Sequence, residues 1–239
     1  MEARVNYIIE SIRNWFNING YKSKAVIGMS GGKDSTIVAA LVAKAIGREN
    51  VIGVSMPDEH QDSKLAKEIC SFLGIEFMEV PIWPMVACMH NVVKSDQSKI
   101  NLPPRIRMTI LYAIAQSNNG RVMNTSNLSE DWLGYSTRWG DSVGDLCVLS
   151  NYTVSEIRDI GMHIGLPKDW VCKTPDDGLQ GSKSDEEKFG FTYDVLDKYI
   201  RTGKCDDLYT RDHIDQMYRA SRFKLEMPQS IPYYEINTH

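Results

Sequence analysis

The chain has 239 residues, of which 42% are hydrophobic and 24% are charged, and it carries a net charge of −4 with a pI near 5.8. This is the composition of an ordinary globular protein, and the length allows a sizeable core without disulfide or metal support. The acidic balance argues against a protein whose main surface grips nucleic acid, and no apolar run approaches the length of a membrane span.

The five cysteines are scattered, with no C-x-x-C pair and no histidine at zinc-ligand spacing. An odd number of unpaired thiols is typical of a reducing compartment. Residues 1–5 show no signal-peptide pattern. We therefore expect a cytoplasmic protein with neither nucleic acid nor a membrane as partner.

The chain begins with a predicted helix over residues 3–18, because Val5, Ile8, Ile12 and Phe16 recur at helical spacing. This apolar face either packs inside the subunit, which is favoured, or joins a partner subunit.

Strands and helices then alternate. Residues 24–29, 51–56 and 75–80 are apolar runs of strand length, while residues 36–46 and 65–73 have helical spacing. The βαβαβ order predicts an α/β fold, in which a twisted parallel sheet has helices on both faces. We expect one Rossmann-like domain over residues 1–239, with ligands at the carboxyl ends of the strands.

The loop between the first strand and the next helix, residues 30–35, reads Ser-Gly-Gly-Lys-Asp-Ser. Its spacing fits neither a Walker A loop nor a G-x-G-x-x-G fingerprint. Two glycines let the backbone wrap a pyrophosphate, and the helix N-terminus favours an anion. The loop therefore predicts a phosphate site for ATP, with hydroxyl donors from Ser30, Ser35 and Thr36.

Asp34 would repel phosphate on its own, so it suits a Mg²⁺ ligand. The alternative is that Asp34 or Ser35 caps the helix.

A helix is expected within residues 81–94, and another opens near Asn101, with Pro103 and Pro104 in its first turn. Arg105 and Arg107 lie two apart and face different sides, so one of them can reach the ligand. The nearby methionines are expected to fill the core: Met85, Met89 and Met108.

A fourth strand, residues 120–124, runs into a polar loop over residues 125–131 that lies near the first loop in a parallel sheet. Glu130 or Asp131 would then share a metal with Asp34. Equally, Ser129 and the two acids open a helix, where carboxylates are favourable.

The region after residue 131 is described by its loops and caps. Residues 132–145 have no clear period and indicate a binding loop. Thr153 and Glu156 form a capping box for a helix over residues 154–164. Residues 172–190 indicate a mobile loop, and helices are expected over residues 191–200 and 206–223.

These pieces together resemble the ammonia-dependent NAD synthetases, within the PP-loop ATP pyrophosphatases. The resemblance runs from about residue 5 to the tail. It rests on these motifs: residues 30–35, residues 105–108, Asn124 and Thr125 with Glu130, residues 137–141 with Asp145, residues 173–175, residues 190–194 with Leu196 and Asp197, and residues 223–228.

The resemblance implies a reaction. ATP adenylates the nicotinate carboxylate of deamido-NAD and releases pyrophosphate, and ammonia then attacks the acyl-adenylate to give NAD and AMP. It also implies that ATP is a substrate, that Mg²⁺ is needed, and that the chain is a homodimer with substrate at the subunit boundary. We expect no glutaminase domain in residues 1–239, and hence free ammonia as the nitrogen source.

The resemblance also implies roles for single residues. Asp34 and Lys173 would be catalytic, Lys173 on a loop that closes over the site, and Asp34 and Glu130 would hold Mg²⁺. The expected ATP contacts are Gly28, Met29, Ser30, Gly31, Gly32, Lys33, Asp34, Ser35 and Thr125. The expected deamido-NAD contacts are Arg105, Arg138, Asp145, Phe223 and Lys224.

Three residues depart from the family pattern. Val154 stands where the family has a basic residue, Asp176 replaces a small hydroxyl residue, and Phe223 stands where histidine is frequent. One alternative is therefore a catalytically impaired protein that only binds adenine nucleotides. Another is a related ATP pyrophosphatase that modifies tRNA or amidates a different carboxylate.

Overall fold

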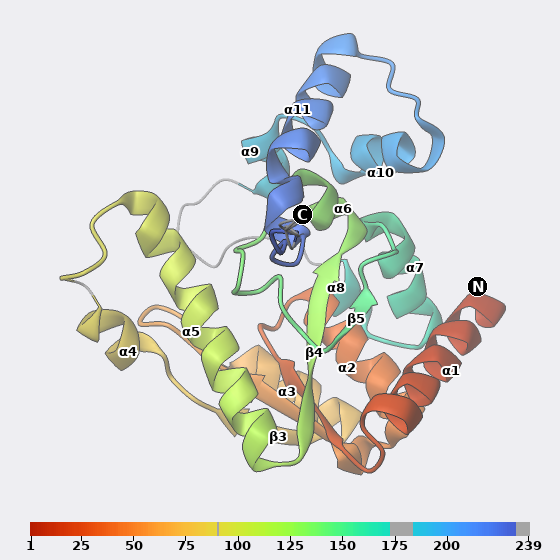
Figure 1. Cartoon of the computed structure of the whole chain (residues 1–239). Coiled ribbons are helices and arrows are strands. Elements are labelled where there is room, and N and C mark those ends of the chain that lie inside the picture. Colours follow the sequence, from red (N-terminus) through yellow and green to blue (C-terminus); the bar gives the residue numbers. More distant parts are fainter. Residues whose placement is uncertain (90, 173–183, 233–239) are drawn as a thin grey trace, which may run out of the picture.

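One sheet of five parallel strands organises the computed structural model, which describes residues 1–89, 91–172 and 184–232 (Figure 1). The strand order is β3-β2-β1-β4-β5. The strands are β1 (Lys24–Gly28), β2 (Val51–Ser55), β3 (Glu76–Glu79), β4 (Gly120–Asn127) and β5 (Leu146–Leu149).

Helices cover both faces of this sheet, as the βαβ pattern predicts. One face packs against α1 (Glu2–Asn19), α2 (Lys33–Ile46), α3 (Lys64–Leu73), α7 (Val154–His163) and α8 (Lys168–Val171). The other packs against α4 (Trp83–Cys88) and α5 (Asp96–Ser117). A third apolar cluster joins α6 (Leu128–Leu133), α9 (Asp185–Phe189), α10 (Tyr193–Thr202) and α11 (Leu208–Leu225).

The centre of the sheet is fully covered. Ala25, Val26 and Ile27 of β1 are all buried, because this strand pairs with β2 on one side and β4 on the other. Such a continuous apolar run is typical of a parallel strand with helices on both faces. The α/β Rossmann-like fold is confirmed.

The N-terminal helix packs inside the subunit: Val5, Ile8, Ile12 and Phe16 of α1 all join the core on one face of the sheet. The favoured interpretation of this helix is therefore confirmed. A short 3-10 turn, Arg48–Asn50, connects α2 to β2.

Several local expectations were wrong. Ser95 accepts a hydrogen bond from the Ser98 amide and starts α5 at Asp96, so Pro103 and Pro104 lie inside the helix and not in its first turn. β5 was not expected, because it is a four-residue edge strand with an irregular register. Met85 and Met89 are 37% and 39% exposed and do not fill the core.

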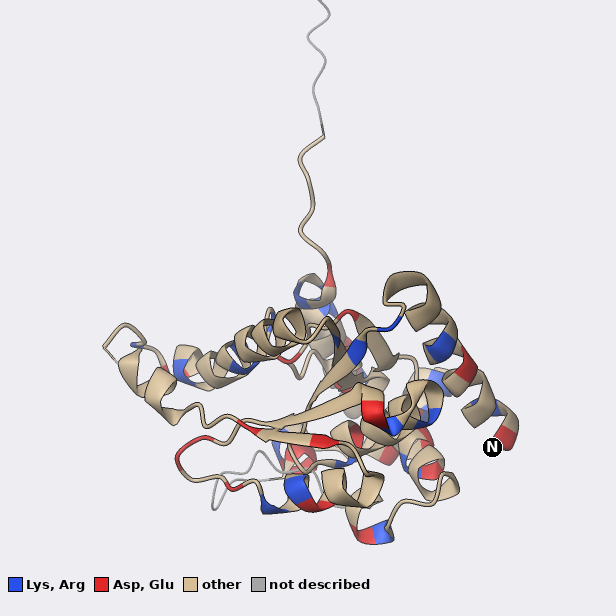
Figure 2. Cartoon of the chain, turned by 90° about the horizontal axis from the view of Figure 1, so that it is seen from below, with Lys and Arg blue, Asp and Glu red and all other residues tan. Residues whose placement is uncertain are grey.

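Charges of both signs are interspersed over the elements (Figure 2). All five cysteines are free thiols. Across the described ranges, no helix combines the length and the apolar character that crossing a membrane requires.

Candidate active site

The loop over residues 30–35 lies where the strand order of the sheet reverses. β1 precedes it, and β4, which neighbours β1, ends at Asn127 just before α6. In an open parallel sheet, ligands bind in the crevice outside the carboxyl ends of strands at this reversal. The predicted proximity of the two segments is confirmed, since Lys33 and Glu130 form an ion pair, but residues 125–131 are the end of β4 and the start of α6 and not a loop.

The loop is held by its own hydrogen bonds. The Gly32 amide donates to Ser30 Oγ at 3.1 Å, and the Ser35 and Thr36 hydroxyls both donate to the Gly32 carbonyl, at 3.1 and 2.8 Å. Gly31 has φ +76°, a conformation that strains other residues. The geometry is that of a preformed cradle.

Two expectations about the loop need correction. The helix begins at Lys33 with Gly32 as N-cap, and no side chain caps it, so neither Asp34 nor Ser35 has the capping role. Thr36 is buried and bonds the loop backbone, so its hydroxyl braces the cradle instead of facing a phosphate.

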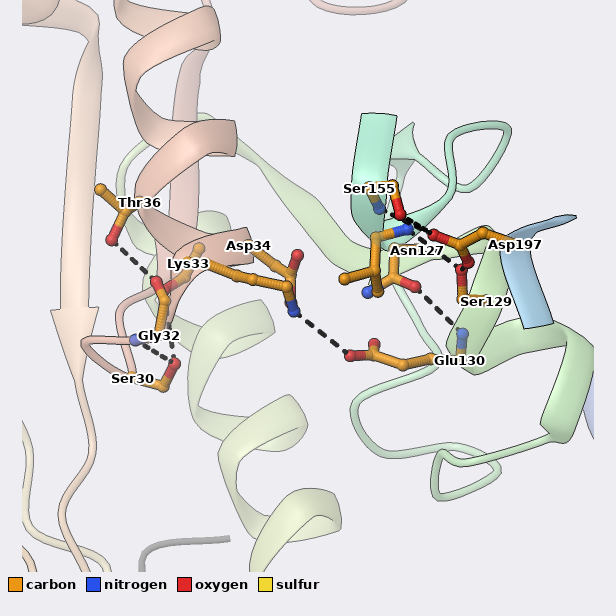
Figure 3. A network of polar contacts seen from close by, with 12 residues as sticks. Ser30, Gly32, Lys33, Asp34, Thr36, Asn127, Ser129, Glu130, Ser155 and Asp197 are labelled. Atoms are coloured by element: carbon orange, nitrogen blue, oxygen red, sulfur yellow. Dashed lines mark hydrogen bonds and ion pairs between the residues drawn. The ribbon is translucent and has the colours of Figure 1, made fainter. Parts of the chain in front are cut away.

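Two carboxylates and one ammonium meet beside the cradle (Figure 3). Lys33 Nζ lies 2.8 Å from Asp34 Oδ2 and 4.0 Å from Glu130 Oε1. Glu130 sits in the first turn of α6, where Asn127 accepts a hydrogen bond from its amide. The Asp131 carboxylate, by contrast, lies near Ser150 and Arg222. Of the two acids, Glu130 is the one that faces Asp34, and it also stands in the helix start.

Burial and neighbouring charges shift the pKa values of Glu130 and Lys33. Burial and the neighbouring Asp34 carboxylate raise the pKa of Glu130 to about 8, against the opposing pull of Lys33. Burial alone would lower the pKa of Lys33, but the Asp34 and Glu130 carboxylates outweigh it and raise it. The carboxylates therefore favour a cation between them.

The two carboxylates fit a magnesium ion. Mg²⁺ takes one or two protein carboxylates and fills its other positions with water and phosphate oxygens. Asp34 Oδ1 is buried and has no hydrogen-bond partner among the described residues. No cluster of three or more potential metal ligands occurs in that part of the chain. Asp34 and Glu130 would hold the ion.

A cavity of about 620 Å³ opens beside the loop. Its lining includes Gly28, Met29, Ser30, Gly32, Lys33 and Asp34 from the loop and Thr125 and Glu130 from the β4 side. A smaller cavity of about 110 Å³ adds Ser35 and is also lined by Ser30, Asp34, Thr125 and Glu130. The structure thus brings eight of the nine expected ATP residues to these cavities, and Gly31 shapes the turn between them.

The expected dinucleotide residues form a separate group, which we call the Arg138 cluster: Arg105, Arg138, Phe223 and Lys224. Arg138 stacks its guanidinium 5.2 Å from the Phe223 ring, and its carbonyl accepts from Arg105 Nε at 3.3 Å. Lys224 Nζ donates to the Gly134 carbonyl at 3.0 Å. Within the described ranges, the residues lining the larger cavity include none of the four.

Asp145 does not join the Arg138 cluster. Its carboxylate accepts from the Val122 amide at 2.7 Å and from the Tyr112 hydroxyl at 3.3 Å. These contacts fasten the chain before β5 to β4 and α5. In this structure the side chain of Asp145 therefore has a structural role.

A buried network lies behind Glu130 (Figure 3). Asp197 accepts hydrogen bonds from Ser129 Oγ at 2.5 Å and from both the amide and the hydroxyl of Ser155, at 2.8 and 2.6 Å. Ser129 in turn accepts from the Val154 amide at 3.0 Å. The network joins α6, α7 and α10 and fixes the residue before Glu130.

Two of the three residues that depart from the family pattern, Val154 and Phe223, lie within the described residues. Val154 is fully buried in the third apolar cluster, and Thr153 caps α7 with Glu156 in the predicted capping box. Arg158, one turn further along α7, is close enough to Lys33 to oppose the rise of its pKa. Phe223 is 59% exposed. Lys173 and Asp176 lie outside the described residues.

Sequence patterns did not decide between Arg105 and Arg107 and did not single out Gln61. Arg107, not Arg105, lines the larger cavity, where Nη2 donates to Gln61 Oε1 at 2.9 Å and Nε donates to the Met56 carbonyl at 3.0 Å. Met108, expected in the core, lines it too. The position of residues 57–62 after β2 could have found Gln61, since strand ends form the crevice.

Comparison with known proteins places this geometry in a family. The family model described as NAD synthase matches residues 4–228. The NH(3)-dependent NAD(+) synthetase of Carboxydothermus hydrogenoformans is 33% identical over 232 residues, covering 92% of this chain and 95% of that protein. The protein of the same name from Methanococcus aeolicus is 37% identical, covering 73% and 72%.

Two solved structures are similar in fold. The NMN synthetase of Francisella tularensis superposes with a TM-score of 0.86 at 27% identity, covering 96% of this chain and 99% of that one. The NH3-dependent NAD synthetase of Campylobacter jejuni gives 0.78 at 24% identity, covering 97% and 98%, and supports the fold alone.

Proposed function

Since the chain belongs to the NAD synthase family, we propose that it is a ligase that makes NAD from deamido-NAD and ammonia at the expense of ATP. The observation that carries this proposal is the convergence of the phosphate cradle, Asp34 and Glu130 at the reversal of the sheet. The chain then needs ATP and ammonia as substrates.

The proposed reaction has two steps on one carboxylate. A nicotinate carboxylate oxygen attacks the α-phosphorus of ATP and pyrophosphate leaves. Ammonia then attacks the carbonyl carbon and loses one proton to solvent, and AMP leaves with the oxygen that bridged carbon and phosphorus. Holding the reacting groups in place supplies much of the rate, and no covalent enzyme intermediate is needed.

The cradle would bind the phosphates through the backbone amides at the start of α2 and through Ser30 and Ser35. Thr125 faces the same space from the β4 side. Asp34 and Glu130 would hold Mg²⁺, which when bound neutralises charge on the departing pyrophosphate. These residues do not transfer a proton in this scheme.

The Arg138 cluster would bind the nicotinate dinucleotide at a subunit boundary. Its aromatic and cationic character suits a nucleotide base or phosphate, and Arg105 and Phe223 in it are exposed. Large apolar side chains exposed on and beside α4 and α5, namely Trp83, Val92 and Ile100 at 52%, 69% and 64%, are consistent with a homodimer. Asp145 and Lys173 stay assigned to substrate binding and to catalysis only by the family resemblance.

We also propose that residues 1–239 form one domain and that the protein is cytoplasmic, in keeping with its five free thiols.

A second substrate follows from the Francisella tularensis NMN synthetase, which matches this chain over 99% of its own length. The same amidation on nicotinate mononucleotide would give NMN. This alternative needs only the nicotinate half of the substrate to be bound.

The test is a side-by-side assay of purified protein with ATP, Mg²⁺ and ammonium, given either deamido-NAD or nicotinate mononucleotide. The proposal expects a larger kcat/KM for NAD than for NMN formation, with one pyrophosphate per product. A larger kcat/KM for the mononucleotide would make nicotinate mononucleotide the substrate in place of deamido-NAD. No product from either compound would overturn the ligase assignment.

A further inference from the structure

Lys33 is the fourth residue of the loop over residues 30–35. Its side chain is only 3% exposed, although lysine is among the residues least often buried. The ammonium lies 2.8 Å from Asp34 and 4.0 Å from Glu130 (Figure 3). A buried ammonium needs such partners. The two carboxylates therefore already share a cation that the chain itself provides.

These are the same two carboxylates proposed to hold Mg²⁺. A divalent ion between Asp34 and Glu130 would stand within a few ångströms of the Lys33 ammonium, and like charges at that distance repel strongly in a buried site. Metal and ammonium therefore exclude each other unless the lysine moves. Its flexible four-carbon stem allows that movement.

Bound nucleotide would offer the ammonium a second partner. Lys33 lines the larger cavity beside the loop, together with Ser30 and Gly32. Phosphate oxygens in that cavity would accept hydrogen bonds from the ammonium. Arg158 adds positive potential near Lys33, which favours moving the ammonium away from the carboxylates toward an anion.

We propose that Lys33 is a resident cation that competes with Mg²⁺ for Asp34 and Glu130, so that the metal binds tightly only after nucleotide phosphates have drawn the ammonium away. This rests on the proposed assignment of Mg²⁺ to the two carboxylates. In the absence of nucleotide, the chain then binds divalent ions weakly.

The test measures the Kd of Mn²⁺ for nucleotide-free protein by electron paramagnetic resonance at pH 8.5. Lys33→Met should bind Mn²⁺ about tenfold more tightly than wild type, because it removes the competing charge. Lys33→Arg keeps the charge and should stay near wild type. Lys44→Met, an exposed position on the same helix, is the matched control.

A folded Lys33→Met protein with unchanged or weaker Mn²⁺ binding would overturn the proposal. Lys33→Gln gives a second neutral variant, which must shift the Kd in the same direction. If neither folds, the wild type decides: saturating Mg²⁺ should shift the ¹⁵N side-chain signal of Lys33, and an unchanged signal contradicts the competition.

Asp34→Asn separates the two possible failures. If it loses Mn²⁺ binding while Lys33→Met has no effect, the metal assignment stands and the competition is wrong. If Asp34→Asn binds Mn²⁺ as wild type does, the metal assignment itself is wrong. Tighter binding in Lys33→Met together with weaker binding in Asp34→Asn is the expected result.

Discussion

The phosphate cradle and the Arg138 cluster differ in how they are built. The cradle follows the central strand β1, and its serines and threonine bond its own backbone. The Arg138 cluster joins a loop after α6 to the end of α11, and Phe223 in it is 59% exposed. In the proposed assignment, ATP binds where the sheet positions its contacts, while the carboxylate substrate binds on peripheral segments at a subunit boundary.

The largest effect on activity is expected from a substitution beside the phosphate cradle. Asp34→Ala should lower kcat about a thousandfold, because a charge-stabilising group at the reacting phosphates is lost. Circular dichroism should show an unchanged fold, since within the described residues one carboxylate oxygen pairs with Lys33 and the other has no hydrogen-bond partner. Steady-state release of pyrophosphate measures the rate. A near-normal kcat would remove Asp34 from the site.

The second largest effect is expected on stability, from a substitution in the hydrogen-bond network behind Glu130. Asp197→Asn weakens three hydrogen bonds that link α6, α7 and α10, so we expect a loss of about 2–3 kcal/mol in the free energy of unfolding. Urea denaturation measures it. Asp159→Asn, exposed on α7, is the control. Equal stability of the two variants would show that the network does not brace the site.

The Arg138 cluster should affect only one substrate. Arg138→Ala is expected to raise the KM for deamido-NAD about tenfold, the size of one lost charged contact, while the KM for ATP stays the same. Arg219→Ala, exposed on the same helix as Phe223, is the control. If the KM for ATP rises instead, the Arg138 cluster belongs to the ATP site, and the two regions do not bind different substrates.

The smallest effect is a dependence of stability on pH. Glu130 titrates at about 8 in the folded chain, above its ordinary 4.5, so the folded state keeps a proton that the unfolded state has lost. In metal-free buffer the free energy of unfolding should therefore fall as pH rises from about 5 to 8. Glu130→Gln should flatten this slope, and Glu68→Gln, on the surface of α3, should not. A slope that survives in Glu130→Gln must come from another group.

The sequence predicts features that depend on local patterns, and it does not predict those that depend on tertiary packing. Strand-length apolar runs and the glycine loop mark the sheet and the cradle, because local patterns decide both. Glu130 was left as one of two acids, since only the packing of α6 chooses which one faces Lys33. The Arg107 contacts depend on β2 and α5 meeting, at residues 46 positions apart, which no local pattern records.

Errors fell where one local signal outweighs another and where tertiary contacts overrule local rules. Two prolines stand inside α5 because Ser95 begins that helix several residues earlier. β5 has too few residues to be seen as a strand and is held by β4 and by the Asp145 contacts.

An acyl-adenylate intermediate requires that one oxygen atom moves from the substrate carboxylate to AMP. Deamido-NAD labelled with ¹⁸O in its nicotinate carboxylate is converted with ATP, Mg²⁺ and ammonium, and the AMP is analysed by mass spectrometry. We expect one ¹⁸O in each AMP and none in pyrophosphate. Unlabelled AMP, or label in pyrophosphate or phosphate, would contradict it.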